Sequence, residues 1–523
     1  MFKKTIRIEE LLYFAFLLFA MGAKGIGLTE GQKLFTICLL AAYCCMAAKL
    51  LITEYSVREW CMNVFLLILA SLIRRSSGET AALAAVLLII GMKEVPLHRA
   101  MKMALFTWGS TFVFSVIRGI LGLGDGVVVV HEKLGLGPII RYSLGYTHPN
   151  VLHVTYFVVV MLLLYVLPFK GKKLWAAAGI LFLGNMYIFM YSVSYTGILI
   201  VTAYLCMTLY LDTRKRITTA EKILIECFAP FCIIFPIAGP LILKGNIFNF
   251  FNRILSTRFE LVYYFFHNFR ISLFGTKTIT PSDAHLTLDS SFAYLLMYYG
   301  VIAFVLLVVV YIAVIHKFVN ENRIREITIM VCTALAGITE QFLFNLSFKN
   351  IAFFCIGNYA YNYLSLKEKN NLWGRKLRII KSEKLEKPFK INVCWENPGF
   401  YMLSKIEWKK SICISLAAAV LCVSIFLVTW DTPDKVYVNK SIADWKADYL
   451  TVGDNMEWDK DANLYVGSID EGERVYELQG FIITVEKVRG MVSSFLWGGV
   501  VGLLVSVTFH RKRKKADIVM RFK

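Results

Sequence analysis

The sequence predicts an all-α polytopic membrane protein: a body of about twelve helices, followed by a two-helix hairpin that carries a small extracellular domain. Of the 523 residues, 57% are hydrophobic and 14% aromatic, more than a soluble domain carries. Apolar runs long enough to cross about 30 Å of hydrocarbon recur along the whole chain. The first run follows MFKKTIRIEE without a small-residue cleavage site, which indicates a retained helix rather than a signal peptide.

The net charge of +20 is concentrated in short segments between the apolar runs. This distribution is typical of the positive-inside rule, so we expect these segments and both termini to be cytoplasmic and expect no nucleic-acid partner. Anionic lipid headgroups are a further possible partner of the basic linker. The segments are PFKGKK at 168–173, DTRKR at 212–216, HKFVNENRIRE at 316–326, the linker from Lys367, and RKRKK at 511–515.

Helices threaded between these basic segments amount to about fourteen membrane spans. The third and fourth are short, and RRSSGE at 74–79 would be an external turn that breaks the positive-inside pattern. The approximate centres of the spans lie at 11–27, 34–52, 61–73, 80–92, 103–121, 151–167, 174–193, 197–211, 223–243, 292–315, 327–345, 350–366, 411–430 and 491–509.

Three stretches lie outside the cell in this topology: 122–150, 244–290 and 431–490. A loop as long as 244–290 is usually functional or disordered, and its many aromatic residues argue against disorder. The third stretch is acidic, and RVYELQGFIITVEKV within it reads as strands. We therefore expect a transmembrane body at 1–366, a basic cytoplasmic linker at 367–410, and a transmembrane hairpin at 411–523 with the extracellular segment 431–490 and a basic cytoplasmic tail.

Several common chemistries have no motif in this sequence. It contains no CxxC, HExxH, Walker or GxSxG pattern, and the glycine-rich turn GLGDG at 122–126 lacks βαβ surroundings. None of the three outer stretches contains a cysteine, so we expect no disulfide framework there. We expect neither a metal ion nor another cofactor.

The 244–290 loop contains the side chains best suited to chemistry. Arginine forks donate charge-assisted hydrogen bonds to phosphate oxygens, and a nearby carboxylate can act as a general base. The loop therefore indicates a diphosphate ligand at the membrane surface. The alternative is a solvated loop whose arginines reach lipid headgroups. The residues concerned are Arg253, Arg258, Arg270, Glu260, Asp283, Asp289, His267 and His285.

The stretch NRILSTRFELVYYFFHNFRISLFGTKTIT, followed by LDSSFAYLLMYYGVIAFVLLVVVYIAVI, resembles the large extracellular loop and next helix of bacterial Wzy-type polysaccharide polymerases. These proteins belong to the O-antigen polymerase and ligase superfamily. The resembling elements are Ser256-Thr257-Arg258, Ser272-Leu273-Phe274-Gly275, Asp289-Ser290-Ser291 and Tyr299-Gly300. RYSLGYTHPN at 141–150, SYTG at 194–197 and TEQFLFNLSFKN at 339–350 resemble further family segments, so the resemblance covers roughly residues 1–366.

The resemblance implies a metal-independent glycosyltransferase that polymerises oligosaccharide repeat units carried on undecaprenyl diphosphate. Its product would be a capsular or exopolysaccharide, made at the outer face of the bacterial cytoplasmic membrane. It also implies that Arg141, Arg253, Arg258 and Arg270 bind the diphosphate, whose charge guanidinium groups stabilise as it leaves. The implied partners are the lipid-linked oligosaccharide, membrane lipids, a flippase and a chain-length regulator.

We expect Asp289 to be the base that activates the acceptor hydroxyl. Ligases of the superfamily usually show a His-Asn pair where this chain has Asp289-Ser290, which favours the polymerase branch. His285 is the alternative base, because residues i and i+4 share one face of a helix. A third interpretation makes Asp289 only the N-cap of the following helix.

Four further residues are expected to support the site, each with a structural alternative. Arg118 is ionisable inside a predicted span, which suggests function; the alternative is an arginine that extends to the membrane interface. His148, next to Asn150, either hydrogen-bonds substrate or closes the turn before Pro149. Glu340, expected in the outer half of its span, would pair with a loop arginine or with Arg118.

Two other functions stay open. One is an O-antigen-ligase-like glycan transferase, and the other is a lipid-linked glycan transporter. Transporters often carry internal repeats and broken helices at mid-membrane, whereas no repeat is evident in this chain. For the hairpin at 411–509 we expect a role in product length or partner docking, the alternative being a lineage-specific decoration.

Overall fold

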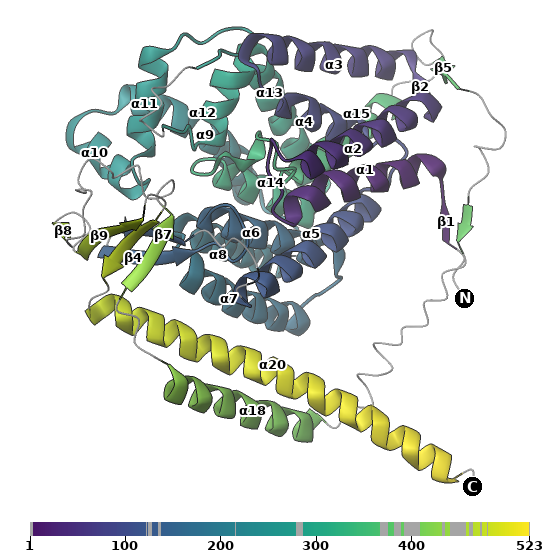
Figure 1. The fold of residues 1–523 in the computed structure, drawn as a ribbon. Helices are drawn as coiled ribbons and strands as arrows, with labels where there is room; N and C mark the ends of the chain where they lie inside the picture. Colours follow the sequence, from purple (N-terminus) through teal and green to yellow (C-terminus); the bar gives the residue numbers. More distant parts are fainter. Residues whose placement is uncertain are drawn as a thin grey trace. The chain divides into compact units, whose positions relative to one another are not determined.

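Helices make up most of the computed structural model (Figure 1). Two units follow from the contacts within the chain: a helical body of Ile6–Val127 and Ser143–Phe389, and a hairpin unit of Met1–Thr5, Val128–Tyr142 and Lys390–Lys523. The body predicted from the sequence was 1–366. The structure describes residues 4–121, 123, 128–133, 137–214, 216–278, 286–366, 375–380, 389–391, 408–430, 435–439, 457–459, 464–470, 473–477 and 480–521.

The helical body is built from apolar helices joined by short connections. Short strands β2 (Tyr55–Ser56) and β5 (Lys376–Leu377) pair in antiparallel fashion within it. The helices are α1 (Ile8–Gly25), α2 (Lys33–Ile52), α3 (Val57–Ser77), α4 (Ala81–Ile90), α5 (Leu97–Ile120), α6 (Pro149–Val166), α7 (Lys172–Ser192), α8 (Tyr195–Asp212), α9 (Thr219–Ile242), α10 (Gly245–Ile254), α11 (Arg258–Asn268), α12 (Ser291–Tyr294), the π-helix η1 (Leu295–Tyr299), α13 (Gly300–Asn320), α14 (Ile324–Ala336), the 3₁₀ turn η2 (Gln341–Leu343) and α15 (Ala352–Leu366).

Neighbours in sequence are mostly neighbours in space. Helix α1 packs against α2 and α5, and α5 packs against α6, which also contacts α7 and α8. Helix α14 contacts α8, α9, α13 and α15, so it lies inside the body, and most of its residues are buried. Helices α10 and α11 follow α9, and α11 packs back onto it (Figure 1).

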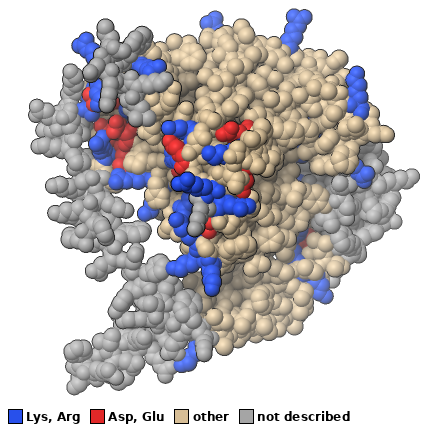
Figure 2. All heavy atoms as spheres, turned by 180° about the vertical axis from the view of Figure 1, so that it is seen from behind, with Lys and Arg blue, Asp and Glu red and all other residues tan. Residues whose placement is uncertain are grey.

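The protein is a multi-spanning helical membrane protein. Large apolar side chains on these helices point outward, as Ile37 and Leu40 do with 63% of their surface exposed, which suits lipid rather than water. Figure 2 shows charged residues gathered in clusters on a face made mostly of other residues. Nine helices of the described residues are long and apolar enough to span: Lys33–Ile52, Leu97–Ile120, Pro149–Val166, Lys172–Ser192, Tyr195–Asp212, Thr219–Ile242, Ser291–Asn320, Lys410–Thr429 and Ile483–Val507.

The other predicted spans correspond to helices that are not among these nine. Helix α4 has 10 residues, α14 has 13 and α15 has 15, fewer than the roughly 20 that cross a bilayer. Helix α1 carries Glu9 and Glu10 in its first turn, and helix α3 carries Arg74 and Arg75 in its last turn. The prediction of a span at 327–345 was wrong beyond Ala336, because the chain leaves the helix there to line a polar cavity.

A buried polar cluster joins α6, α7 and α8. His153 is fully buried, with Nδ1 2.9 Å from Ser192 Oγ and Nε2 2.7 Å from Asn185 Oδ1. Asn185 also donates to the carbonyl of Ile198 at 3.1 Å. Because Gly197 has no side chain, the imidazole fits against its backbone; a Cβ there would lie 2.4 Å from the ring. His153 is therefore a satisfied packing residue.

Several ion pairs involve the first turns of α1 and α3. Glu59 is fully buried at the start of α3, where it closes a capping box with Ser56 and meets Lys93 Nζ at 2.5 Å. Arg378, from the basic linker, lies 3.3 Å from Glu9, so this part of the linker is attached to the body. Such buried charges require partners because burial alone disfavours them.

The hairpin unit combines two helices with small sheets. Helices α18 (Trp408–Thr429) and α20 (Gly480–Arg521) pack antiparallel through small residues, with Ser415 Oγ donating to the Gly499 carbonyl at 2.6 Å. The prediction of strands beyond Gly480 was wrong, since α20 begins there. The strands are β1 (Lys4–Ile6), the hairpin β3 (Val128–Lys133) and β4 (Gly137–Tyr142), β6 (Phe389–Ile391), and a sheet ordered β7-β10-β9-β8 from Lys435–Asn439, Glu473–Glu477, Leu464–Asp470 and Glu457–Asp459.

Two glycines allow the part of the 244–290 loop around Gly275 to approach the start of α13. Gly275 has φ +89° and Gly300 has φ +84°, a region that other residues rarely adopt. A Cβ on Gly275 would lie 1.9 Å from the Tyr298 carbonyl oxygen. The approach lets Val301 N donate to the Ser272 carbonyl at 3.0 Å. The SLFG and YG segments therefore form one packed turn.

We expect Gly275→Ala to destabilise the body by at least about 2 kcal/mol, because strain at positive φ adds to a backbone clash. Thermal melting of the purified protein in detergent measures the change. The matched control is Gly179→Ala, at a helical position with no atom within 4 Å of the new Cβ, which should melt like the parent chain. Equal melting of the two variants would contradict the close approach.

Candidate functional site

The segment between α14 and α15 forms one wall of the candidate site. Helix α14 stops at Ala336, and Glu340 has extended backbone, with φ −127° and ψ 131°. The expectation that Glu340 lies within a helical span was therefore wrong. Its carbonyl accepts a hydrogen bond from Ser291 Oγ, and the Gly337 carbonyl accepts one from Ser291 N at 2.9 Å. Side chains and loop backbone thus replace the missing helical bonds.

The turn before α12 forms the second wall. Ser290 is the N-cap of α12, since its hydroxyl accepts a hydrogen bond from Ala293 N. Asp289 is therefore not the cap, and its carboxylate is available for another role. Thr287 Oγ1 donates to Asp289 Oδ1 at 3.1 Å, and the Asp289 side chain remains 31% exposed.

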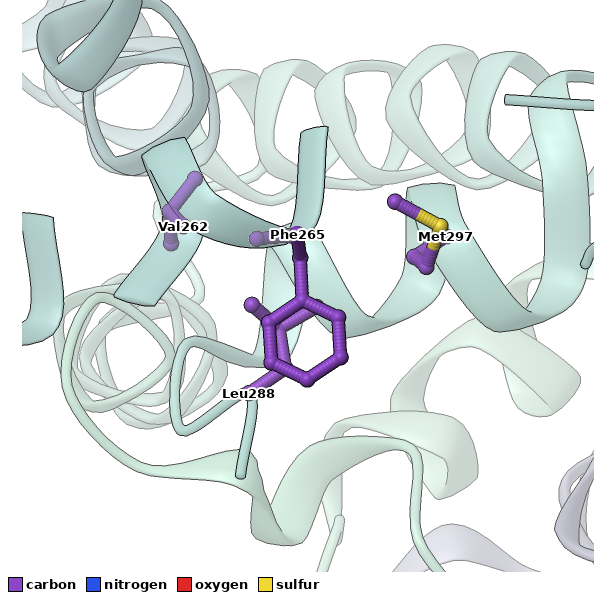
Figure 3. Packing of buried hydrophobic residues seen from close by; sticks show 5 residues of the cluster. Val262, Phe265, Leu288 and Met297 are labelled. Carbon is purple, nitrogen blue, oxygen red and sulfur yellow. The ribbon is translucent and has the colours of Figure 1, made fainter. Parts of the chain in front are cut away.

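Apolar packing places this turn against α11. Val262 and Phe265 of α11 pack with Leu288, Ala293 and Met297 in one buried cluster (Figure 3). Leu288 is adjacent to Asp289, and Val262 lies one helical turn after Arg258. The hydrophobic cluster therefore holds the start of α11 and the Asp289 turn in a defined register.

Arg258 connects the two walls. Its Nε donates to the Thr339 carbonyl at 2.6 Å and Nη1 to the Leu255 carbonyl at 3.0 Å. Its Nη2 lies 3.5 Å from Asp289 Oδ2 and 3.8 Å from Glu340 Oε1. The Arg258 side chain is 9% exposed, so one buried guanidinium serves two carboxylates.

The SYTG segment supplies a further partner for Glu340. Ser194 caps α8 by accepting from Gly197 N at 3.3 Å, which turns the next residues toward the site. Thr196 Oγ1 then donates to Glu340 Oε1 at 2.5 Å. Glu340 is held by a hydroxyl and a nearby guanidinium, and its side chain is only 10% exposed.

A cavity of about 450 Å³ lies where these segments meet. Asp289 and Glu340 contribute to its lining, together with residues from the end of α1, the start of α6 and the 340–349 segment. All belong to the helical body, so the cavity lies within one unit. Its lining comprises Lys24, Gly27, Leu28, Thr29, Glu30, Tyr146, Thr147, His148, Asn150, Val151, Val154, Thr287, Asp289, Glu340, Gln341, Phe342, Asn345, Leu346, Ser347 and Lys349.

The residues THPN start α6 at the cavity wall. His148 is the N-cap, and its Nδ1 accepts a hydrogen bond from Asn150 N at 3.1 Å, while Pro149 occupies the first helical position. His148 therefore closes the turn before Pro149, and both His148 and Asn150 line the cavity. The two interpretations offered for His148 are thus compatible.

The expected arginines separate in the structure. Arg253 and Arg270 are exposed, and neither lines the cavity. Arg141 is buried in β4, where its backbone is paired with Val129, and β4 belongs to the hairpin unit. His285 lies outside the described residues. Among the described arginines of the 244–290 loop, Arg258 contacts the carboxylates Asp289 and Glu340 that line the cavity, although Arg258 itself is not part of the lining.

Arg118 lies beside the cavity rather than in its lining. It follows the buried part of α5, and its guanidinium is close to the backbone of Gly145 and Gly27. Its Nε is buried without a hydrogen-bond partner among the described residues. No ion pair joins it to Glu340 in the part of the chain that the structure describes.

Two lysines of the cavity were missed by the sequence analysis. Lys349 is 4% exposed and follows the 340–348 turn, whereas Lys24 lies at the end of α1. A signal for Lys24 was present, because an ionisable residue inside the predicted span 11–27 indicates function. Lys349 lay between two predicted spans and read as an ordinary loop residue.

The site combines acidic and basic groups in the lining of one cavity. Asp289 and Glu340 supply proton acceptors, and Lys24 and Lys349 supply cations. Within the described residues no three His, Cys, Asp or Glu side chains gather closely enough to hold a metal ion. Chemically, the cavity can bind an anionic polar ligand and accept a proton from a hydroxyl.

Comparisons with protein-family models, curated proteins and solved structures give no match. The class of the protein therefore rests on its own features. It is a multi-spanning helical membrane protein with a polar cavity at the end of the body that carries the 244–290 loop.

Proposed function

We propose that the protein is a glycosyltransferase that polymerises oligosaccharide repeat units carried on undecaprenyl diphosphate. The observation that carries the proposal is the pair of carboxylates, Asp289 and Glu340, that one buried arginine holds at the wall of a polar cavity. Four of the segments that carry the sequence resemblance contribute: the STR, DSS, SYTG and TEQ segments are joined by hydrogen bonds and an ion pair.

Asp289 is the general base in this proposal. Its carboxylate is the more exposed of the two, at 31% against 10% for Glu340, and faces the cavity. Glu340 already accepts a short hydrogen bond from Thr196 and is better suited to holding Arg258 in place. His285 remains the alternative base.

In the proposed reaction, an acceptor sugar hydroxyl attacks the anomeric carbon of the donor sugar. Asp289 takes the hydroxyl proton as the new glycosidic bond forms. The bond between the anomeric carbon and the phosphate oxygen breaks, and undecaprenyl diphosphate leaves with the electron pair. A cation near the departing diphosphate stabilises this charge, as in other electrostatically assisted transfers.

The proposed orientation puts the cavity at the outer face of the bacterial cytoplasmic membrane. Helix α6 starts at the cavity, after its N-cap His148, and runs toward the basic segment 168–173. Helix α8 starts next to Thr196, which contacts the cavity residue Glu340, and runs toward the basic segment 212–216. Basic connections are enriched on the cytoplasmic side of membrane proteins. This distribution supports an external site, where lipid-linked repeat units are polymerised.

Purified full-length protein in liposomes should convert lipid-linked repeat units into a ladder of longer lipid-linked products, resolved on a gel. The matched control is Asp289→Asn, which should leave the repeat unit unextended. Removal of the protein from its host should abolish one surface polysaccharide and accumulate the lipid-linked repeat unit.

Other results would contradict polymerisation. Single transfer of a finished chain to a different acceptor would identify a glycan ligase. Movement of the lipid-linked repeat unit across the bilayer without extension would identify a transporter. Absence of all three activities with several repeat-unit structures would remove the glycan proposal.

A further inference from the structure

Lys349 is a buried cation that has no evident structural task. It is 4% exposed and lies between α14 and α15, outside the candidate membrane spans. No carboxylate of the described residues lies within 4.0 Å of its Nζ. Buried lysines usually have such a partner, because an unpaired charge in the interior is costly.

The contacts that Lys349 makes are weak. Its Nζ donates to the Val151 carbonyl at a long 3.4 Å, and that carbonyl already accepts from Thr155 Oγ1 at 2.6 Å. Its ammonium also lies 5.7 Å from the centre of the Trp108 ring. Removal of the charge would therefore leave the Val151 carbonyl satisfied.

A second lysine lines the same cavity. Lys24 lies 4.3 Å from the Phe35 ring centre and 3.7 Å from Glu30 Oε1, a distance that leaves its ammonium with donors for another ligand. Lys24 and Lys349 both line the cavity, as do Asp289 and Glu340.

We propose that Lys349 and Lys24 form an anion subsite in the cavity, which binds a phosphate or carboxylate group of the substrate. The inference rests on the proposed function for the identity of that substrate, but anion binding does not depend on turnover. It assigns to two lysines of the cavity lining the role that was predicted from the sequence for arginines; among these arginines, Arg258 donates to the Thr339 and Leu255 carbonyls and is not part of the lining.

The protonation behaviour of Lys349 suits this role. The pKa of Lys349 is lowered to about 7, chiefly by burial and also by the charge of nearby Lys24, while the charge of Glu340 acts in the opposite direction. Glu30, His148 and Asp289 line the same cavity. An anion beside the ammonium favours the charged form and offsets the desolvation that burial imposes.

Two sources offer the required chemistry, and separate probes distinguish them. Inorganic pyrophosphate represents the diphosphate of the lipid carrier. An acidic tetrasaccharide of alternating glucuronate and N-acetylglucosamine represents a repeat unit that contains a uronic acid, with neutral cellotetraose as its uncharged counterpart. Calorimetric titration of the full chain in lipid nanodiscs at pH 6.5 measures each dissociation constant.

We expect at least one anionic probe to bind, and Lys349→Gln to weaken it about tenfold or more, since a charged hydrogen bond contributes about 1.5–3 kcal/mol. Lys349→Arg should retain binding, and Lys24→Gln should weaken it less. The control is Lys317→Gln, an exposed lysine in α13 that lies beside Glu321. If Lys349→Gln loses pyrophosphate binding, the ligand of the subsite is the diphosphate of the carrier. If it loses binding of the acidic tetrasaccharide, the ligand is the carboxylate of the sugar.

A structural role for Lys349 predicts a different result. Lys349→Met removes the buried charge without orphaning a carbonyl, so its melting temperature in the absence of anion should match or exceed that of the parent. Equal affinity of the Lys349→Gln variant and the parent for every anionic probe overturns the inference, as does a sharp drop in melting temperature for Lys349→Met. Polymer synthesis by the parent chain would still support the proposed function in that event.

Discussion

Asp289→Asn is expected to lower the rate of repeat-unit extension about 10²- to 10⁴-fold, the usual cost of losing a general base. Asparagine keeps the size of the side chain and can still accept the hydrogen bond from Thr287 at the position of Oδ1. What it loses is the negative charge and the proton acceptor. Single-turnover extension of a labelled lipid-linked repeat unit measures the rate.

Little change in stability should accompany this loss. The Asp289 side chain is 31% exposed and lies 3.5 Å from Arg258, so we expect its charge to contribute no more than about 1 kcal/mol. Ser290→Ala is the matched control at the next residue. It removes the N-cap of α12, which should cost about 1 kcal/mol of stability but leave the chemical step intact.

Near-normal extension by Asp289→Asn would end the general-base proposal for this residue. The alternative base would then be His285, and His285→Gln should be the inactive variant. If Ser290→Ala lost extension as completely as Asp289→Asn, the local fold of the turn would be responsible rather than proton transfer.

Arg258→Ala should have the largest effect on stability, about 3–5 kcal/mol, as expected when one member of a buried charge cluster is removed. It leaves the Thr339 and Leu255 carbonyls without their donor and Glu340 without a nearby cation. At temperatures below the melting temperature, the rate of repeat-unit extension should also fall at least about tenfold, because Asp289 is no longer held in position. Thermal melting and extension assays on the same preparation separate the two effects.

Conservative replacement tests whether Arg258 positions the carboxylates. Lysine retains the charge but cannot donate to two carbonyls and approach two carboxylates at once, so Arg258→Lys should recover only part of stability and activity. The control is Arg253→Ala, which replaces an exposed arginine of α10 in the same loop. The stability of this variant should differ from that of the parent by no more than about 0.5 kcal/mol.

A double variant measures the coupling between Arg258 and Glu340. Glu340→Gln removes the charge that Arg258→Ala leaves unpaired, so the double variant should be more stable than the sum of the single losses predicts. Additive losses would show that the 3.8 Å approach contributes nothing, and would reduce Arg258 to a backbone-bonding residue.

Local features of the chain were readable without the structure. Pro149 after His148 predicts a helix start, and the structure has α6 beginning at that proline. Long apolar runs predict spans, and nine described helices have the required length and hydropathy. These features depend on residues close in sequence, so sequence alone contains the information.

The site depended on contacts between distant segments. The sequence pointed to Arg258, Asp289 and Glu340 separately, but it also offered Arg253 and Arg270, which carry the same charge in the same loop. Which arginine turns inward is decided by the packing of Val262, Phe265 and Leu288, which buries the start of α11 against the Asp289 turn. Spacing along the chain does not report that packing.

The sequence by itself determined the class of this protein, a helical membrane protein, because hydrophobicity over about 20 residues decides whether a helix enters lipid. Only the tertiary structure decided where α14 ends and which groups line the cavity. Glu340 leaves the helix because Ser291 and Arg258 bind the loop backbone in place of helical bonds. The same turn places Lys349 at the site. The burial of this charged side chain depends on residues that are distant in sequence, so its sequence neighbours do not indicate it.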